Sequence, residues 1–236
     1  MISVVIPALN AERHLPATLA ALVPAAVDGI VREVIVVDGG STDRTRQVAD
    51  HAGTEFLQAK QGRGTQLCQG AARAKFPWLL FLHADTVLEG GWTHEAVDFM
   101  HRVDIGEHPR AAAAFRFKLD DKGLAPRFLE MIVGARCAVF RVPYGDQGLL
   151  ISRRLFDEIG GYKSMPIMED VDIVRRLGRK RVVLLNADAT TSAERYRREG
   201  YFLRTLRNQT CLALYGVGLP IDTIARVYGT AKAARD

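Results

Sequence analysis

The sequence predicts an α/β fold with a mostly parallel sheet flanked by helices. Two observations in the first third of the chain support this prediction. Short runs of aliphatic and β-branched residues recur at 3–6, 34–37 and 78–82, and such continuous apolar strands are typical of a parallel sheet covered on both faces. Helix-like segments follow them at 11–22, 42–51 and 65–74. In this βαβαβα order, ligands are expected at the carboxyl ends of the strands.

The second half of the chain is less regular but continues the pattern. It predicts a strand at 111–119, a helix at 124–138, a glycine-rich stretch at 144–162, a helix at 169–177 and a strand at 181–185. Two further helices are expected at 201–215 and 221–234, separated by glycines and a proline. We therefore expect one domain over 1–190 and a helical C-terminal extension over 191–236 that packs on it.

Composition narrows the partners only coarsely. The 236 residues are 48% hydrophobic, which suffices for a packed core. The net charge of +5 suits nucleotide diphosphates, nucleic acid or an acidic membrane surface without choosing among them. Three widely spaced cysteines indicate a reducing compartment, and the first residues resemble a strand rather than a signal peptide. A cytoplasmic protein, at most peripheral on the inner face of a membrane, is expected.

The ends of the first two predicted strands carry the first candidate site. Asp38 ends the second strand and is followed by two glycines, with Ser41 as a candidate helix N-cap. Asn10 follows the first strand. A nucleotide base or ribose fits such a turn, and so does an ordinary glycine-rich connection without a ligand. The Asp-Gly-Gly run is also similar to the cofactor loop of S-adenosylmethionine methyltransferases, although that loop normally follows a first strand.

Gly62, Arg63 and Gly64 precede the third predicted helix. A flexible backbone with a guanidinium at a helix N-terminus suits a diphosphate. A solvated loop with a surface arginine is the alternative.

His83, Ala84 and Asp85 follow directly on the third apolar strand. One carboxylate together with the oxygens of a bound diphosphate suffices to hold Mg2+. The imidazole of a histidine suits Mn2+ better than Mg2+. A strand-end histidine bonded to backbone is the alternative for His83.

Two further polar elements lie in the second half. Glu169, Asp170 and Asp172 fall within four residues at a helix start, where a helix cannot point all of them into one site. They favour either general-base chemistry or complementation of the helix dipole. Asp146, Gln147 and Gly148 form a polar glycine-rich element that suits sugar or acceptor hydroxyls, or only a turn.

Together these motifs resemble the family 2 glycosyltransferases, which have the Rossmann-like GT-A fold. The segments at 4–10, 36–43, 83–86 and 168–170 occur in the order of that family, and the match extends to about residue 185. The Gly-Arg-Gly, His-Ala-Asp-Thr and Tyr-Gly-Asp-Gln-Gly runs are most similar to a small bacterial subgroup described as selenodomain-associated transferases.

The resemblance implies roles for individual residues. Asp85 matches the last position of the Asp-x-Asp metal motif, and His83 replaces the first. Asp170, beside Glu169, matches the general base of an inverting transfer. The Gln-x-x-Arg-Trp motif of processive synthases is missing, so transfer of one sugar is expected. Contacts to the donor nucleotide are implied for Pro7, Ala8, Asn10, Glu12, Asp38, Gly62, Arg63, Gly64 and Ala84.

The resemblance implies a divalent cation, Mn2+ or Mg2+, as cofactor. It implies a UDP-linked nucleotide-sugar and an acceptor of unknown identity as partners. A lipid-linked acceptor, peripheral membrane contact and a homodimer are all compatible with the sequence. A nucleic-acid partner is not expected, because the arginines around Arg195 lack interleaved aromatic platforms. A methyltransferase and a non-catalytic nucleotide-sugar-binding protein are the competing hypotheses.

Overall fold

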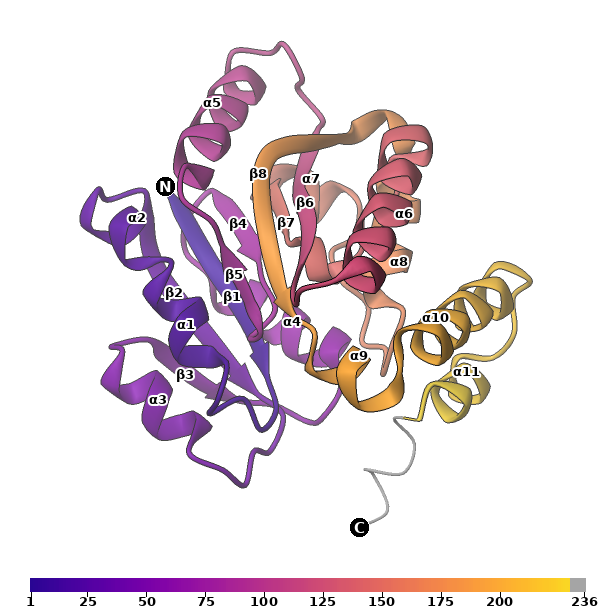
Figure 1. The fold of residues 1–236 in the computed structure, drawn as a ribbon. Helices are drawn as coiled ribbons and strands as arrows, with labels where there is room; N and C mark the ends of the chain where they lie inside the picture. The colour runs from indigo at the N-terminus through magenta and orange to yellow at the C-terminus, as the bar shows by residue number, and fades with distance from the viewer. Residues whose placement is uncertain (230–236) are drawn as a thin grey trace.

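A single eight-stranded mixed sheet organises the chain in the computed structural model, which describes residues 1–229 (Figure 1). The strand order is β3-β2-β1-β4-β7-β6-β8-β5. Strands β3, β2, β1 and β4 are parallel to one another, and β7 joins β4 to β6 in antiparallel pairing. Strand β8 runs parallel to β6 and pairs with β5 in antiparallel orientation. The strands are β1 (Ile2–Ala8), β2 (Val31–Asp38), β3 (Glu55–Gln58), β4 (Trp78–Phe81), β5 (Thr86–Leu88), β6 (Ala112–Asp120), β7 (Leu149–Ser152) and β8 (Val182–Ser192).

Helices cover both faces of the sheet, as the apolar strands predicted. Val4 and Val5 are neighbours in β1 and point to opposite faces, so each belongs to a different hydrophobic core. One core packs against α1 (Leu15–Ala20), α2 (Val23–Val27), α3 (Thr45–His51) and α5 (Trp92–Asp104). The other packs against α4 (Arg63–Arg73), α7 (Arg153–Glu158) and α8 (Glu169–Leu177).

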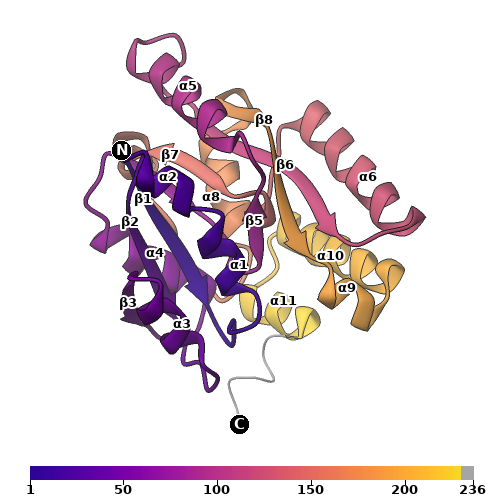
Figure 2. The ribbon, with the colours of Figure 1, turned by 60° about the vertical axis from the view of Figure 1, so that its left-hand side comes forward.

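The C-terminal helices gather below the end of β8, beside the long helix α6 (Leu124–Phe140) (Figures 1 and 2). They are α9 (Glu194–Glu199), α10 (Tyr201–Gly216) and α11 (Ile221–Tyr228). A separate small core joins Ile167, Met168 and Val171 to Cys211 and Ile224. This core attaches α10 and α11 to the start of α8, which places them beside the carboxyl ends of the strands.

Several predicted boundaries need correction. The helix predicted at 11–22 is shortened to α1, and a separate helix that was not predicted, α2, follows it; each has a proline in its first turn. Ser41 does not cap α3, since its hydroxyl hydrogen-bonds to Asp38 and the helix begins at Thr45. Short β3 and β5 and the helices α5 and α9 were not predicted.

At the C-terminal end, α11 ends at Tyr228, and the last residues of the helix predicted at 221–234 lie outside the described residues. The sheet itself ends with β8 at Ser192, just past the boundary predicted at 190. Within residues 1–229, none of the helices has the length and apolarity that crossing a bilayer requires.

Candidate active site

The loops after β1 and β2 are joined by side-chain hydrogen bonds. The amide of Asn10 donates to Ser41 Oγ at 2.8 Å, and the amide of Thr42 donates back to Asn10 Oδ1 at 2.9 Å. The amide of Glu12 donates to Asp43, and its carboxylate accepts from the amide of Arg44 at 2.9 Å. Asn10 adopts a left-handed φ of 50°, which asparagine tolerates better than most residues. These bonds join the two loops into one ordered edge at the ends of β1 and β2.

Asp38 forms the centre of that edge. Its side chain is buried, and Oδ2 accepts hydrogen bonds from the amides of Gly40 and Ser41, both at 2.9 Å. Oδ1 accepts from the Ser41 hydroxyl. Asp38 therefore orders its own loop, and any nucleotide contact would use the carboxylate lone pairs that these bonds leave free.

Helix α4 packs against these two strand ends. Gln66 is buried and donates from Nε2 to the carbonyls of Ala8 at 2.9 Å and Val37 at 2.7 Å, one at each strand end. Gly64 lies against another loop, because a Cβ there would come within 2.3 Å of the Lys163 carbonyl oxygen. Only glycine permits this approach, so the first turn of α4 is held between the strand ends and the segment before α8.

Arg63, in that first turn, faces the two adjacent acids of α8. Its Nε lies 2.6 Å from Glu169 Oε1, and its Nη2 lies 4.0 Å from Asp170 Oδ2. Asp170 Oδ2 also accepts from the Gly145 amide at 2.8 Å. Asp172 points elsewhere, since it pairs with Lys163 at 3.0 Å and Arg176 at 2.6 Å. The helix thus separates the three acids, as the spacing predicted.

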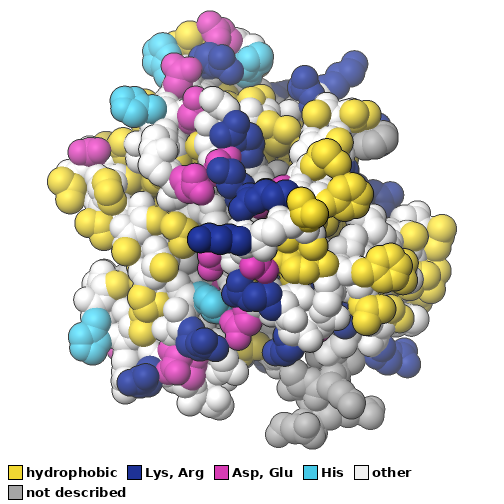
Figure 3. All heavy atoms as spheres, in the orientation of Figure 1, with side chains coloured by type: hydrophobic (Ala, Val, Ile, Leu, Met, Phe, Trp, Pro, Cys, Tyr) yellow, Lys and Arg dark blue, Asp and Glu magenta, His cyan; other side chains and the backbone are white. Residues whose placement is uncertain are grey.

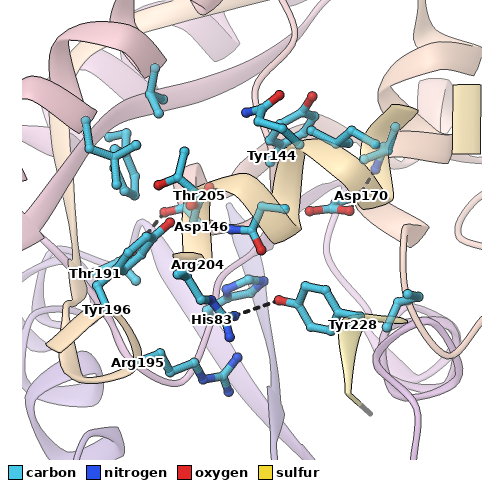
Figure 4. A pocket seen from close by; sticks show the side chains of 18 of the residues that line it. His83, Tyr144, Asp146, Asp170, Thr191, Arg195, Tyr196, Arg204, Thr205 and Tyr228 are labelled. Atoms are coloured by element: carbon cyan, nitrogen blue, oxygen red, sulfur yellow. Dashed lines mark hydrogen bonds between the residues drawn. The ribbon is translucent and has the colours of Figure 1, made fainter. Parts of the chain in front are cut away.

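A cavity of about 160 Å³ lies in front of Asp170 (Figure 4). Five residues predicted from sequence line it: Arg63, His83, Asp85, Asp146 and Asp170. They come from four different elements and converge because Gly145 allows close packing. A Cβ at residue 145 would lie 2.7 Å from His83 Nε2 and 3.2 Å from Asp170 Oδ2.

Burial shifts the pKa values of three groups here. It lowers the pKa of His83 to about 4, and nearby Arg63 acts in the same direction. It raises the pKa of Asp146 to about 6 and that of Glu169 to about 7, although Arg136 and Arg63 respectively oppose these shifts. Near neutral pH, His83 is therefore a neutral imidazole with a lone pair to offer.

The side chains that line the cavity fit a divalent cation that takes its remaining ligands from a bound phosphate compound. Within residues 1–229, no group of three or more His, Cys, Asp or Glu side chains is arranged to hold a metal alone. However, Asp85 and neutral His83 line the same cavity, and Asp146 Oδ1 is buried there without a hydrogen-bond partner among the described residues. Two or three protein donors with phosphate oxygens match the way Mg2+ is commonly held.

Some predicted residues lie away from the cavity. Glu169 is fully buried behind Arg63. Gln147 is also buried: its Nε2 donates to the Phe115 carbonyl at 2.8 Å, so its amide serves the interior of the fold. Gly148 has a φ of 65° and packs beside Phe115. The residues predicted to bind the nucleotide, from Pro7 to Asp38, lie at the adjoining strand ends.

The sequence did not predict the far wall of the cavity. This wall consists of Tyr196, Arg204, Thr205, Asn208 and Tyr228 from the C-terminal helices, and Arg136 and Tyr144 also line the cavity (Figure 4). Arg204 donates from Nη2 to the Tyr228 hydroxyl at 2.8 Å and pairs with Glu199 at 3.2 Å. The polar residues at 204, 205, 208 and 209 recur at helical spacing. This polar helix face was the feature of the sequence that could have indicated the wall.

Comparison with known proteins identifies the family. The sequence model described as glycosyl transferase family 2 matches residues 3–123, just over half of the chain. The chain belongs to glycosyl transferase family 2. The matched segment contains both strand-end loops, the Gly-Arg-Gly turn and the His-Ala-Asp segment.

Individual relatives match in part. A PGL/p-HBAD biosynthesis glycosyltransferase of Mycobacterium bovis is 37% identical over 123 residues, which cover 46% of this chain and 43% of that protein. A glucosyl-3-phosphoglycerate synthase of Mycobacterium tuberculosis is 34% identical over 95 residues, covering 36% of this chain and 29% of that enzyme. The chain thus aligns with less than half the length of either relative.

Solved structures support the GT-A-like fold over a larger part of the chain. Glucosyl-3-phosphoglycerate synthase of M. tuberculosis, crystallised with Mn2+, UDP and phosphoglyceric acid, has a TM-score of 0.62 and 23% identity. That superposition covers 93% of this chain and 79% of the other. A complex of the same enzyme with Mg2+ and UDP has a TM-score of 0.57 and covers 81% and 71%.

Proposed function

We propose that this family 2 member transfers one sugar from a UDP-linked donor to an acceptor hydroxyl, with inversion at the anomeric carbon and the help of a divalent cation. Family membership supports glycosyl transfer over methyl transfer. The crystallised relative binds UDP with Mn2+ or Mg2+, which favours the same donor and cation here.

The donor half of the proposal rests on the joined strand ends. The nucleotide would lie along the edge made by residues 7–12 and Asp38, with its diphosphate directed toward the first turn of α4. The positive end of the α4 dipole favours an anion at such a turn, although the Gly64 amide already donates to the Met165 carbonyl at 3.1 Å. Arg63 is available there as a bidentate phosphate ligand, once it exchanges Glu169 for phosphate oxygens.

Asp85 and His83 would hold the cation, with Asp146 as a further candidate ligand. When bound, the cation would supply charge neutralisation for the departing diphosphate. The remaining chemistry belongs to the side chains of the protein.

The single observation that carries the proposal is the place of Asp170. Its carboxylate is held by the Gly145 amide at 2.8 Å, faces the cavity and lies beside both His83 and Arg63. Asp170 would accept the proton of the acceptor hydroxyl as that oxygen bonds to the anomeric carbon. The bond from that carbon to the diphosphate breaks, and the diphosphate leaves with the electron pair. A base held in place by a backbone amide needs little reorganisation for this step.

The test is Asp170→Asn. We expect the variant to keep the rise in melting temperature caused by UDP and Mn2+, because the donor site is intact. Sugar transfer, or donor hydrolysis where no acceptor is supplied, should fall by about a thousandfold or more. Asp172→Asn is the control within the same turn. Full turnover by the Asp170→Asn protein would refute the assignment, and a wild-type protein that binds UDP without any turnover would favour the non-catalytic alternative.

Several narrower statements stay predictions: membership of the selenodomain-associated subgroup, a cytoplasmic location, a homodimer and a lipid-linked acceptor. The sugar contacts proposed for Gln147 and Gly148 would have to be made through their backbone, since the Gln147 side chain is bonded within the fold.

A further inference from the structure

Helices α6 and α10 both expose a row of large apolar side chains. Figure 3 shows hydrophobic side chains gathered over these helices on one face of the molecule. On α6 the row consists of Leu124, Phe128, Met131, Ile132 and Val139, and on α10 of Phe202, Leu203 and Leu206. Phe128 is 61% exposed and Phe202 is 76% exposed. Contiguous apolar patches of this kind mark sites of interaction on soluble proteins.

The row on α6 is an organised helix face. At about 100° per residue, its five members fall within an arc of roughly 100°. The opposite side of the helix packs inward through Leu129 and Cys137, which are buried. One apolar face of α6 is therefore buried against the sheet, whereas its second apolar face is exposed.

The cavity lies between the two helices. Leu129 and Val133 of α6 line it on one side, and Thr205 and Leu212 of α10 line it on the other. The inward faces thus form the wall of the site, while their outward faces form the exposed rows. A molecule that covers the rows is therefore next to the cavity.

The charges around the rows select the kind of partner. Helix α10 has no acidic residue, and the single acid of α6, Glu130, is paired with Arg127 at 2.6 Å. Lys122 and Arg141 are exposed at the two ends of α6, and Arg198, which is exposed and pairs with Glu199 at 3.5 Å, lies just before α10. Within residues 1–229, the cavity-lining Arg136 and Arg195 form no ion pair with a carboxylate. Apolar rows with a basic border match an anionic membrane surface.

We infer that the outward faces of α6 and α10 dock on an anionic lipid bilayer and present the cavity mouth to it. The acceptor would then be an amphiphile whose polar, hydroxyl-bearing head enters the cavity from the membrane; this last clause rests on the proposed function. A second copy of the chain is a poorer occupant, because a twofold contact through this face would bring the like-charged borders together.

Vesicle co-sedimentation tests the inference directly. The probes are vesicles of phosphatidylglycerol and phosphatidylcholine in equal parts, and vesicles of phosphatidylcholine alone. We expect binding to the anionic vesicles that weakens as NaCl is added, since salt screens the basic border. The double variant Phe128→Ser/Phe202→Ser should have a partition coefficient lower by about tenfold or more, since two large apolar side chains no longer enter the bilayer.

The matched control is Val23→Ser/Val27→Ser on α2, at the other side of the molecule (Figure 1). These two valines are 55% and 80% exposed, so the control removes exposed apolar surface without touching α6 or α10. Its vesicle binding should equal that of the wild type. Absence of binding, or equal loss in both double variants, would overturn the inference. So would a dimer in sedimentation velocity that only the α6–α10 variant abolishes, without vesicle binding.

Fluorescence supplies a readout that does not depend on a loss of binding. Trp78 and Trp92 are buried and should not respond to lipid. A tryptophan placed by Phe128→Trp should shift its emission to the blue with anionic vesicles, whereas one placed by Val27→Trp should not. UDP-induced stabilisation is measured in parallel. Vesicle binding without that stabilisation would reject the proposed UDP-linked donor but support the docking surface. Stabilisation without vesicle binding would support the donor and reject the docking surface.

Discussion

The two sides of the site are built in different ways. The proposed donor side consists of strand ends and the first turn of α4, and its side chains bond to nearby backbone groups of the strand ends and loops, as Asp38 and Gln66 do. The proposed acceptor side consists of faces of α6, α9, α10 and α11, whose polar groups bond mainly to one another, as Arg204 does with Glu199 and Tyr228. Short motifs therefore define the donor side, whereas helix packing defines the acceptor side. Substitutions should accordingly cost more on the donor side.

The largest effect is expected from Arg63→Ala. It leaves the buried Glu169 carboxylate without its partner, which typically costs about 3 kcal/mol or more of unfolding free energy. Adding Glu169→Gln should recover most of this loss, because a neutral amide needs no counterion. Urea unfolding of the two variants measures the difference. If the single and double variants are equally stable, the pair does not hold α4 to α8.

A smaller loss is expected from Gly64→Ala. The added methyl would come within 2.3 Å of the Lys163 carbonyl oxygen, so the first turn of α4 must move, at a cost of about 1–3 kcal/mol. Gly134→Ala is the matched control, because that glycine lies within α6 with nothing near its Cβ position. The control should gain up to about 1 kcal/mol from helix propensity. Thermal unfolding of both proteins checks the contrast in sign.

At the candidate cation site, Asp146→Asn should change the pH dependence of stability. The pKa of Asp146 is raised from 3.8 to about 6, chiefly by burial, so the folded state holds its proton more tightly than the unfolded chain. Stability contributed by this group is full below about pH 4 and falls as pH rises through 6. The variant lacks that loss and should be more stable at about pH 8, on the order of 1–2 kcal/mol, with no gain at about pH 4. A pH-independent difference in melting temperature would contradict the assignment.

The smallest effect is expected from Tyr228→Phe. The change removes the hydroxyl that accepts from Arg204 Nη2, worth about 1 kcal/mol, while leaving the aromatic ring over the guanidinium. Hydrogen exchange should increase in α11 and remain unchanged in β1 and β2. An equal increase at the strand ends would show that the two sides of the site are coupled rather than separate.

The same difference explains what the sequence could predict. The bounds of α8, Glu169–Leu177, are as predicted, because its apolar spacing is regular and Gly178 ends it. Arg63, His83, Asp85, Asp146 and Asp170, all named from the sequence, line one cavity. All but Asp146 follow a strand or begin a helix, which is the pattern that singled them out. Their chemical roles stay predictions.

The far wall of the cavity, formed by the C-terminal helices, could not be predicted in the same way. Asn208 and Tyr228 reach the cavity through the packing of α10 and α11 on α8, and Tyr196 of α9 reaches it through packing on β6 and α6. Both arrangements depend on contacts distant in sequence. Gln147 shows the opposite limit. Its polar side chain in a glycine-rich turn indicated a ligand, yet its amide completes the interior hydrogen bonds of the turn.

The pairing of β5 with β8 bears on when the protein becomes active during its synthesis. β5 begins at Thr86, directly after the His-Ala-Asp segment, and its Thr86 hydroxyl bonds to that of Thr191 at 2.7 Å. The Asp85 carbonyl accepts from the Ser192 amide at 3.0 Å. The candidate cation ligands therefore gain their support only after the ribosome has released β8.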